Sequence, residues 1–188
     1  MSDLKPTLCI GSVAELQPDL LLGQVPGLSA ITFDLDKTLT GQHEWSIPYV
    51  NIEALIAIDA LGLRIGIISN ANSRSRTSRV HILADTASGY LDEPIEVVTS
   101  LEVGGKKKPL RQPFDKMAEK LAIRNNEMCH VGDQLLKDVL GANRADCGGS
   151  VLVRPFGRGD DPRVKYLQRP IEAAIRPLLG LPFLVKNF

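Results

Sequence analysis

Two aspartates, Asp34 and Asp36, stand one residue apart directly after the apolar run from Ala30 to Phe33. Carboxylates this close repel each other and lose hydration free energy when they are buried, so a protein core gains nothing from them. The same groups can act as a nucleophile or as a general acid and base, and they can bind a hard cation. The pair therefore indicates a chemical site, although turn or helix-cap residues are the alternative interpretation.

Other polar groups follow apolar runs further along the chain: Ser69 and Asn70 after the run 63–69, three lysines at 106–108 before Pro109, and the sequence GDQLLKD at 132–138 after the run 128–132. In an open parallel sheet, ligands bind beyond the carboxyl ends of the strands, near the point where strand order reverses. We therefore expect these groups to face one crevice. Taken alone, Ser69 and Asn70 are typical of turns and the lysines of a solvated loop.

The elements that must position these groups are indicated by an alternation of two patterns. Runs rich in β-branched residues occur at 29–33, 63–69, 95–99, 128–132 and 150–154. Apolar residues recur at helical spacing between them, at 50–58, 114–121 and 135–140. This alternation predicts an α/β fold in which helices cover both faces of a central parallel sheet.

The polar groups resemble the motifs of the haloacid dehalogenase-like (HAD) phosphatases. Those motifs are D-x-D-x-T after an apolar strand, a Ser or Thr that ends a strand, a lysine, and G-D-x-x-x-x-D, and they occur here in that order between residues 29 and 154. The resemblance implies a Rossmann-like three-layer sandwich and a phosphomonoester hydrolase that forms an aspartyl-phosphate. It implies that Asp34 is the nucleophile and that Asp36 moves the proton.

The resemblance also implies a Mg²⁺ ion. Its expected protein ligands are Asp34, the backbone carbonyl of Asp36, and Asp133, with Asp138 orienting a water or the lysine behind them. A hard site rich in oxygen suits this ion, which offsets the charge of a phosphate facing two carboxylates.

The remaining motif residues are expected to bind the phosphoryl group. Ser69 would donate a hydrogen bond to its oxygens with Asn70 beside it, and Lys108 would offset its charge. Thr38 is expected to hold the turn and contribute to substrate binding. Because three lysines are consecutive, Lys106 or Lys107 could take the place of Lys108 if the alignment shifts.

Within the superfamily the chain is most similar to the small YqeG-like branch, which is related to mitochondrial phosphatidylglycerophosphate phosphatases. The similarity includes the segments SNANS at 69–73 and GDQLLKDVLGANR at 132–144, and a Gln-Arg-Pro-Ile-Glu helix at 168–172. Apart from a surplus near residues 85–94, the segments between motifs are long enough only for a helix and a strand each, so we expect no large cap domain. The branch implies a phospholipid phosphate as substrate.

Composition limits the other functions that we consider. Lysine plus arginine equals aspartate plus glutamate at 22 each, which gives no reason to expect a nucleic-acid partner. Three separated cysteines give neither a disulfide framework nor a zinc site, and the N-terminus has no signal-peptide pattern, so we expect a cytoplasmic protein. Membrane contact is expected to be peripheral at most, and a homo-oligomer is compatible with an open crevice.

Three alternatives remain at the level of sequence. The chain could be a non-catalytic scaffold of the same fold, although Asp34, Asp36, Lys108 and Asp133 are all present. It could be a phosphatase of a soluble sugar phosphate, a nucleotide or a phosphoprotein. A two-component receiver domain also carries an acidic cluster and a lysine, but it lacks D-x-D-x-T after its first strand.

Three further segments have two interpretations each. The cluster SRSRTSR at 73–79 is either the exposed start of a helix or a grip for an anionic substrate. His43 and Trp45 either cover the site as a flap or anchor a loop on the core. The apolar C-terminal segment 178–185, with Lys165, Arg169 and Arg176 nearby, either packs on the core or touches a membrane.

We expect a single domain over residues 1–188, because this length supports one well-buried core. Residues 1–28 are expected to form a helical arm, with a capping pattern at Ser12 and Glu15, and residues 29–154 the catalytic core. Residues 155–188 are expected to form a polar loop followed by a helix that opens at Pro170 and ends at Gly180.

Overall fold

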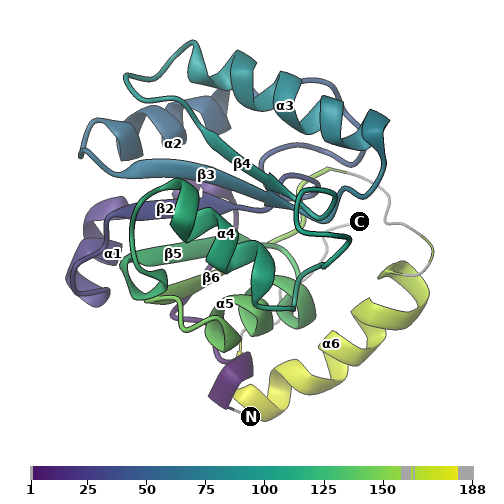
Figure 1. The fold of residues 1–188 in the computed structure, drawn as a ribbon. Coiled ribbons are helices and arrows are strands. Elements are labelled where there is room, and N and C mark those ends of the chain that lie inside the picture. Colours follow the sequence, from purple (N-terminus) through teal and green to yellow (C-terminus); the bar gives the residue numbers. More distant parts are fainter. Residues whose placement is uncertain (1, 158–161, 163, 182–188) are drawn as a thin grey trace.

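The structure is a computed structural model that describes residues 2–157, 162 and 164–181. Its strands are β1 (Leu8–Ile10), β2 (Ala30–Phe33), β3 (Arg64–Ser69), β4 (Glu96–Thr99), β5 (Met128–Gly132) and β6 (Gly149–Val153). Its α-helices are α1 (Pro18–Gln24), α2 (Tyr49–Asp59), α3 (Arg74–Ser88), α4 (Gln112–Lys120), α5 (Leu140–Arg144) and α6 (Arg169–Ile175). All strands are parallel and form one sheet in the order β1-β6-β5-β2-β3-β4 (Figure 1).

Helices cover both faces of this sheet. Ile31 and Phe33 of β2 belong to a buried cluster with residues of α1, α2 and α3, whereas Ala30, the first residue of the same strand, belongs to a second cluster with residues of α4 and α5. Both faces of a strand are therefore apolar, which is why the strands read as continuous apolar runs in the sequence. The predicted α/β sandwich with a central parallel sheet is confirmed.

The predicted apolar runs correspond to β2 through β6, each within one residue of its observed ends. Strand β1 was not predicted. It lies inside the segment 1–28 that was expected to be a helical arm, which also contains α1 and a 3₁₀ turn at Val13–Glu15. β1 has three residues and pairs only with β6, where Cys9 lies opposite Leu152, so its stability comes from a distant part of the chain and not from a local pattern.

No cap domain is inserted between residues 34 and 128, all of which the structure describes. β2 leads to α2 through residues 34–48, and β3 leads to β4 through α3 and a short loop. The surplus at residues 85–94 forms the end of α3 and the turn after it. No domain inserted in this part of the chain therefore covers the crevice beyond the strands.

The C-terminal helix begins earlier than predicted. A π-helical turn at Val164–Gln168 precedes α6, and a 3₁₀ turn at Arg176–Leu179 follows it, up to Gly180 at φ 66°. Parts of the predicted polar loop (158–161 and 163) and of the apolar C-terminal segment (182–188) lie outside the described residues. None of the described helices has both the length and the apolar composition that crossing a bilayer requires.

Candidate active site

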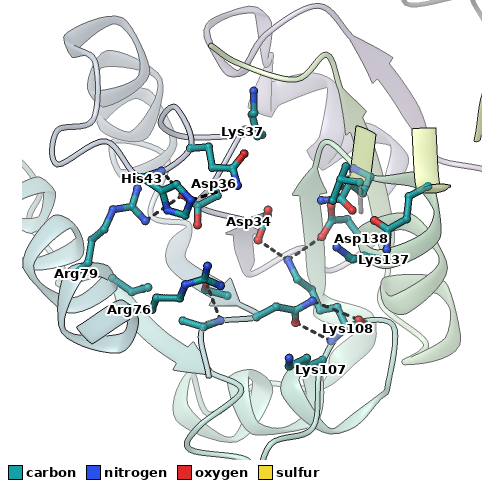
Figure 2. Close-up of a pocket in the computed structure, with 18 residues that line it drawn as sticks. Asp34, Asp36, Lys37, His43, Arg76, Arg79, Lys107, Lys108, Lys137 and Asp138 are labelled. Carbon is teal, nitrogen blue, oxygen red and sulfur yellow. Dashed lines mark hydrogen bonds and ion pairs between the residues drawn. The ribbon is translucent and has the colours of Figure 1, made fainter. Parts of the chain in front are cut away.

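The sheet order creates a crevice between β2 and β5. From β2 the chain moves outward through β3 and β4, then crosses back to β5 on the other side of β2, so strand order reverses between these two central strands. Asp34 follows β2 and Asp133 follows β5, at the carboxyl ends where ligands bind in such sheets. A cavity of about 430 Å³ opens here, and Asp34, Asp36, Ser69, Asn70, Lys108 and Asp138 are among its lining residues (Figure 2).

Lys108 joins two of the carboxylates. Its Nζ lies 2.7 Å from Oδ1 of Asp34 and 2.7 Å from Oδ1 of Asp138, and the side chain is almost completely buried. Asn70 holds the lysine backbone from β3: its Oδ1 accepts from the Lys108 N–H at 2.8 Å, and its Nδ2 donates to the Lys108 carbonyl at 3.3 Å. Lys107 also lines the cavity, but only Lys108 among the three consecutive lysines is in an ion pair with Asp34.

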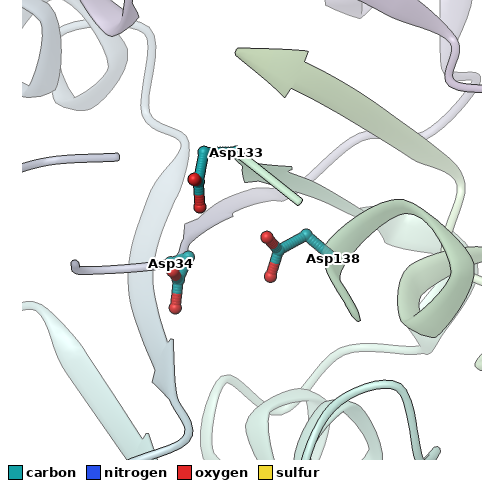
Figure 3. Close-up of side chains that lie close together, drawn as sticks. All are labelled: Asp34, Asp133 and Asp138. Atoms are coloured by element: carbon teal, nitrogen blue, oxygen red, sulfur yellow. The ribbon is translucent and has the colours of Figure 1, made fainter. Parts of the chain in front are cut away.

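Three buried carboxylates form a cluster that could hold a cation. Asp34, Asp133 and Asp138 each offer an oxygen, and these oxygens lie within 4.8 Å of one another (Figure 3). Oδ1 of Asp133 is buried and accepts no hydrogen bond from any residue that the structure describes. A buried carboxylate oxygen without a partner is costly, and a divalent cation among three carboxylates would satisfy it. The donor set therefore fits a hard divalent metal ion.

The cluster includes Asp138 directly, although the sequence placed this residue behind the ligands. A π-helical turn at Leu135–Val139 carries it, and its Oδ2 accepts from the Gln134 N–H at 2.9 Å. A Cβ added to Gly132 would lie 2.4 Å from the Asp138 Cβ. The glycine of the motif thus leaves the room that the Asp138 side chain occupies.

Burial and the neighbouring basic groups together give the three acids different pKa values. It raises the pKa of Asp34 to about 7, although Lys108 opposes this, and it raises the pKa of Asp133 to about 6 against the effect of Arg169. The pKa of Asp138 lies below its usual range, because Lys108 and His130 outweigh the effect of burial. Asp138 is therefore the carboxylate that is held ionised even without a metal.

Sequence reasoning missed His130, which lies behind this cluster in β5. The ring is fully buried, its Nδ1 is 2.9 Å from the Thr32 Oγ1, and its Nε2 is 3.5 Å from both the Lys108 Nζ and the Asp138 Oδ1. Burial and the Lys108 charge lower its pKa to about 4, so the ring is neutral at pH 7. A polar side chain inside a buried strand, two residues before a Gly-Asp pair, was the signal available.

Asp36 lies at the mouth of the cavity and is held by α3. Its Oδ1 is 3.0 Å from Nη1 of Arg79 and accepts from the His43 N–H at 3.3 Å. Arg79 is buried and also donates from Nε to the Glu44 carbonyl at 2.7 Å. One guanidinium thus connects Asp36 to the loop that carries His43.

The structure also places the two segments 73–79 and 43–45 relative to the cavity. In the cluster 73–79, Ser73 caps α3 by accepting from the Arg76 N–H and the first turn is exposed, but Arg79 is buried at the site. His43 lines the cavity, whereas Trp45 is 64% exposed and does not anchor the loop on the core.

The other expected phosphoryl ligands fall in different places. Ser69 ends β3, lines the cavity, and accepts from the Ala71 N–H at 3.3 Å. Thr38 is buried, does not line the cavity, and has an Oγ1 without a partner among the described residues. Ser69, Asn70 and Lys108 thus line the same cavity as Asp34, whereas Thr38 does not.

Comparisons with known proteins agree with this fold. The haloacid dehalogenase-like hydrolase family matches residues 44–146, more than half of the chain, and the chain belongs to that family. A relative in Bacillus subtilis (strain 168), named probable phosphatase YqeG, is 29% identical over 136 residues, which cover 71% of this chain and 68% of the relative. The chain is therefore a haloacid dehalogenase-like phosphatase, a phosphoric monoester hydrolase.

Solved structures show the same fold. An uncharacterized protein from Listeria monocytogenes serotype 4b is 22% identical with a TM-score of 0.53, over 72% of this chain and 85% of that one. An uncharacterized protein from Corynebacterium glutamicum is 20% identical with a TM-score of 0.50, over 82% of this chain and 97% of that one. These similarities support the architecture and carry no information about a substrate.

Proposed function

We propose that the protein hydrolyses phosphomonoesters through an aspartyl-phosphate on Asp34. The observation that carries the proposal is the meeting of Asp34 with Lys108 and the buried carboxylates Asp133 and Asp138 at one cavity. A carboxylate at the end of a central strand can approach the phosphorus, and a fixed cation beside it can offset the charge on the phosphoryl oxygens.

The first half of the reaction forms a bond between an Asp34 oxygen and phosphorus and breaks the bond between phosphorus and the ester oxygen. Asp36, in its acid form, gives a proton to the leaving oxygen, which departs as an alcohol. Asp36 suits this role because it lies on the same loop as Asp34 and lines the same cavity. Ser69, Asn70 and Lys108 surround the phosphoryl group and hold it in line with Asp34.

The second half consumes water. Asp36, now a carboxylate, takes a proton from the water, whose oxygen bonds to phosphorus while the bond between phosphorus and Asp34 breaks. Inorganic phosphate leaves, Asp34 is regenerated, and Asp36 regains the proton that it lost. The overall reaction is ester plus water to alcohol plus phosphate.

Mg²⁺ is the proposed cofactor, and Asp34, Asp133 and Asp138 are the side chains that would hold it, with the backbone carbonyl of Asp36 beside them. Bound there, the ion would supply charge stabilisation for the phosphoryl oxygens. Mg²⁺ fits because the cluster is made only of oxygen donors.

We further propose a phospholipid phosphate, such as phosphatidylglycerophosphate, as the substrate. Arg76, Lys107 and Lys137 line the cavity and form no ion pair with any described residue, so they can face further negative charge on a substrate or on an anionic membrane surface. Beside the cavity, the outer side of the C-terminal helix exposes Tyr166 and Leu167. A basic rim next to an exposed apolar face suits a headgroup presented at a lipid surface.

The catalytic proposal is tested with Asp34→Asn. We expect the variant to lose at least about a thousandfold in turnover of p-nitrophenyl phosphate with Mg²⁺, because no carboxylate remains to form the phosphoenzyme. The Asp19→Asn variant, changed in the first turn of α1, serves as the matched control and should retain the rate. Full activity of Asp34→Asn, or a stable phosphoenzyme in the unmodified protein that never turns over, would refute a phosphatase mechanism at this residue.

A further inference from the structure

Arg169 reaches the carboxylate cluster from a part of the chain that carries none of the four motifs. It is the first residue of α6, 36 positions after Asp133. Its Nη1 donates to the Asp133 carbonyl at 2.9 Å, and its Nη2 pairs with Oδ2 of the same residue. One guanidinium thus holds both the backbone and the side chain of a proposed metal ligand.

The arginine is itself held in place. Its Nη1 lies 3.3 Å from Oε2 of Glu172, one turn along α6, and the other oxygen of Glu172 accepts from the Leu136 N–H at 3.1 Å. Glu172 is buried, and Leu136 belongs to the turn that follows Asp133. Through this one Arg-Glu pair, α6 is attached both to Asp133 and to Leu136 in the turn that follows it.

The two oxygens of Asp133 have different surroundings. Oδ2 is bound to Arg169, whereas Oδ1 is buried and has no hydrogen-bond partner in the described part of the chain. An arginine bound to one oxygen fixes the side-chain rotamer and leaves the other oxygen free for a cation.

We propose that Arg169 is a positioning residue for the metal site, which makes cation affinity depend on the C-terminal helix. This inference rests on the proposed metal site of the phosphatase. Arg169 acts through Asp133: it holds the carboxylate and the backbone carbonyl of that residue in place, and it needs no contact with the phosphate ester.

The test measures metal binding directly, with Mn²⁺ as the probe and free Mn²⁺ counted by electron paramagnetic resonance. Arg169→Lys keeps the charge beside Glu172 but cannot contact the carbonyl oxygen and Oδ2 of Asp133 at the same time. Arg169→Gln removes the charge. We expect both variants to bind Mn²⁺ about ten- to a hundredfold more weakly than the unmodified protein, the usual cost of losing a group that orients a ligand. Lys165→Gln removes an exposed charge from the turn before α6 and should leave binding unchanged.

A second readout separates positioning from a loss of folding. At high Mg²⁺ concentration the Arg169→Lys protein should recover most of its turnover of p-nitrophenyl phosphate, while its thermal unfolding stays cooperative. Unchanged Mn²⁺ affinity in Arg169→Lys would overturn the inference, and tighter binding would overturn it by making the arginine a competitor of the metal. If the unmodified protein binds no Mn²⁺, the metal part of the proposed function fails as well, which is a different result.

Discussion

At the scale of residues, the site is defined by two basic side chains that each pair with two carboxylates. Lys108 is shared by Asp34 and Asp138, and Arg169 is shared by Asp133 and Glu172. The four acids and Lys108 are buried, and Arg169 is partly buried. Buried carboxylates that outnumber their cations favour a bound divalent ion and favour protonation when it is absent. The fold therefore keeps an excess of carboxylates over basic groups at the site.

This excess of carboxylates gives a prediction for the metal-free protein. Burial raises the pKa of Asp34 from 3.8 to about 7. Between pH 4 and pH 7, Asp34 is therefore protonated in the folded state and ionised in the unfolded state. The contribution of Asp34 to stability therefore falls as pH rises from about 4 to about 7. His130 contributes in the opposite direction over part of this range, since its lowered pKa of about 4 makes the unfolded state bind more protons.

A difference measurement isolates the aspartate. In EDTA, the free energy of unfolding of Asp34→Asn, minus that of the unmodified protein, should increase from pH 4 to pH 7, because asparagine does not titrate. Urea unfolding at half-unit pH intervals gives this difference, with His130 present in both proteins. A difference that stays constant with pH would contradict the raised pKa.

At the scale of elements, the turn after β5 requires a residue without a side chain. Gly132 does not adopt a positive φ, so its role is space: a Cβ there would lie 2.3 Å from the Asp138 Cγ. Gly132→Ala should therefore displace Asp138 and cost about 1–3 kcal/mol of stability, as overpacking in a filled site does. Phosphatase turnover should fall together with the stability.

Gly23→Ala is the matched control for this change. Gly23 lies in α1, and an added Cβ would meet nothing within 4 Å, so the variant should be neutral or slightly more stable. Urea unfolding and p-nitrophenyl phosphate turnover are measured on both alanine variants. Equal behaviour of the two would show that the close packing of Asp138 on Gly132 is not needed.

The parts of the fold and site that could be predicted were those with a local pattern. β2 and β5 are buried on both faces, so each reads as an apolar run, and Asp34 and Asp133 follow directly. β1 could not be predicted because three residues paired with β6 leave no period in the sequence. Arg169 and Arg79 could not be predicted because their partners depend on how α6 and α3 pack, and arginines on a helix are typical of a solvated face.

At the scale of the whole molecule, the C-terminal segment has an inner side and an outer side with different roles. Arg169 and Arg176 turn inward and are at least partly buried, and Ile175 and Leu179 pack against Leu135 and its neighbours. Core packing therefore accounts for the inner side of the helical segment up to residue 181, where the described residues end, and both arginines belong to that inner side. Figure 1 shows α6 along the side of the sheet that carries α5.

The outer side leads to the last prediction. Leu167 and Leu178 are 63% and 75% exposed, and Val164 and Gln168 of the same helical segment line the cavity. If the substrate is presented at an anionic lipid surface, these leucines enter it, and each buried side chain contributes up to about 1.5–3 kcal/mol. The double variant Leu167→Gln/Leu178→Gln should then hydrolyse phosphatidylglycerophosphate in vesicles at least about tenfold more slowly.

Turnover of p-nitrophenyl phosphate should not change in this variant, because the substituted side chains are directed away from the packed core and do not line the cavity. Leu20→Gln/Leu22→Gln on α1, which removes two exposed leucines at a site well away from α6 in Figure 1, is the matched control and should affect neither substrate. Equal rates of all three proteins on vesicles would show that Leu167 and Leu178 do not contribute to hydrolysis at a lipid surface. Hydrolysis of sugar phosphates but not of the lipid would exclude the lipid substrate while leaving the chemistry on Asp34 intact, since the carboxylates and Lys108 act on the phosphoryl group whatever alcohol it is attached to.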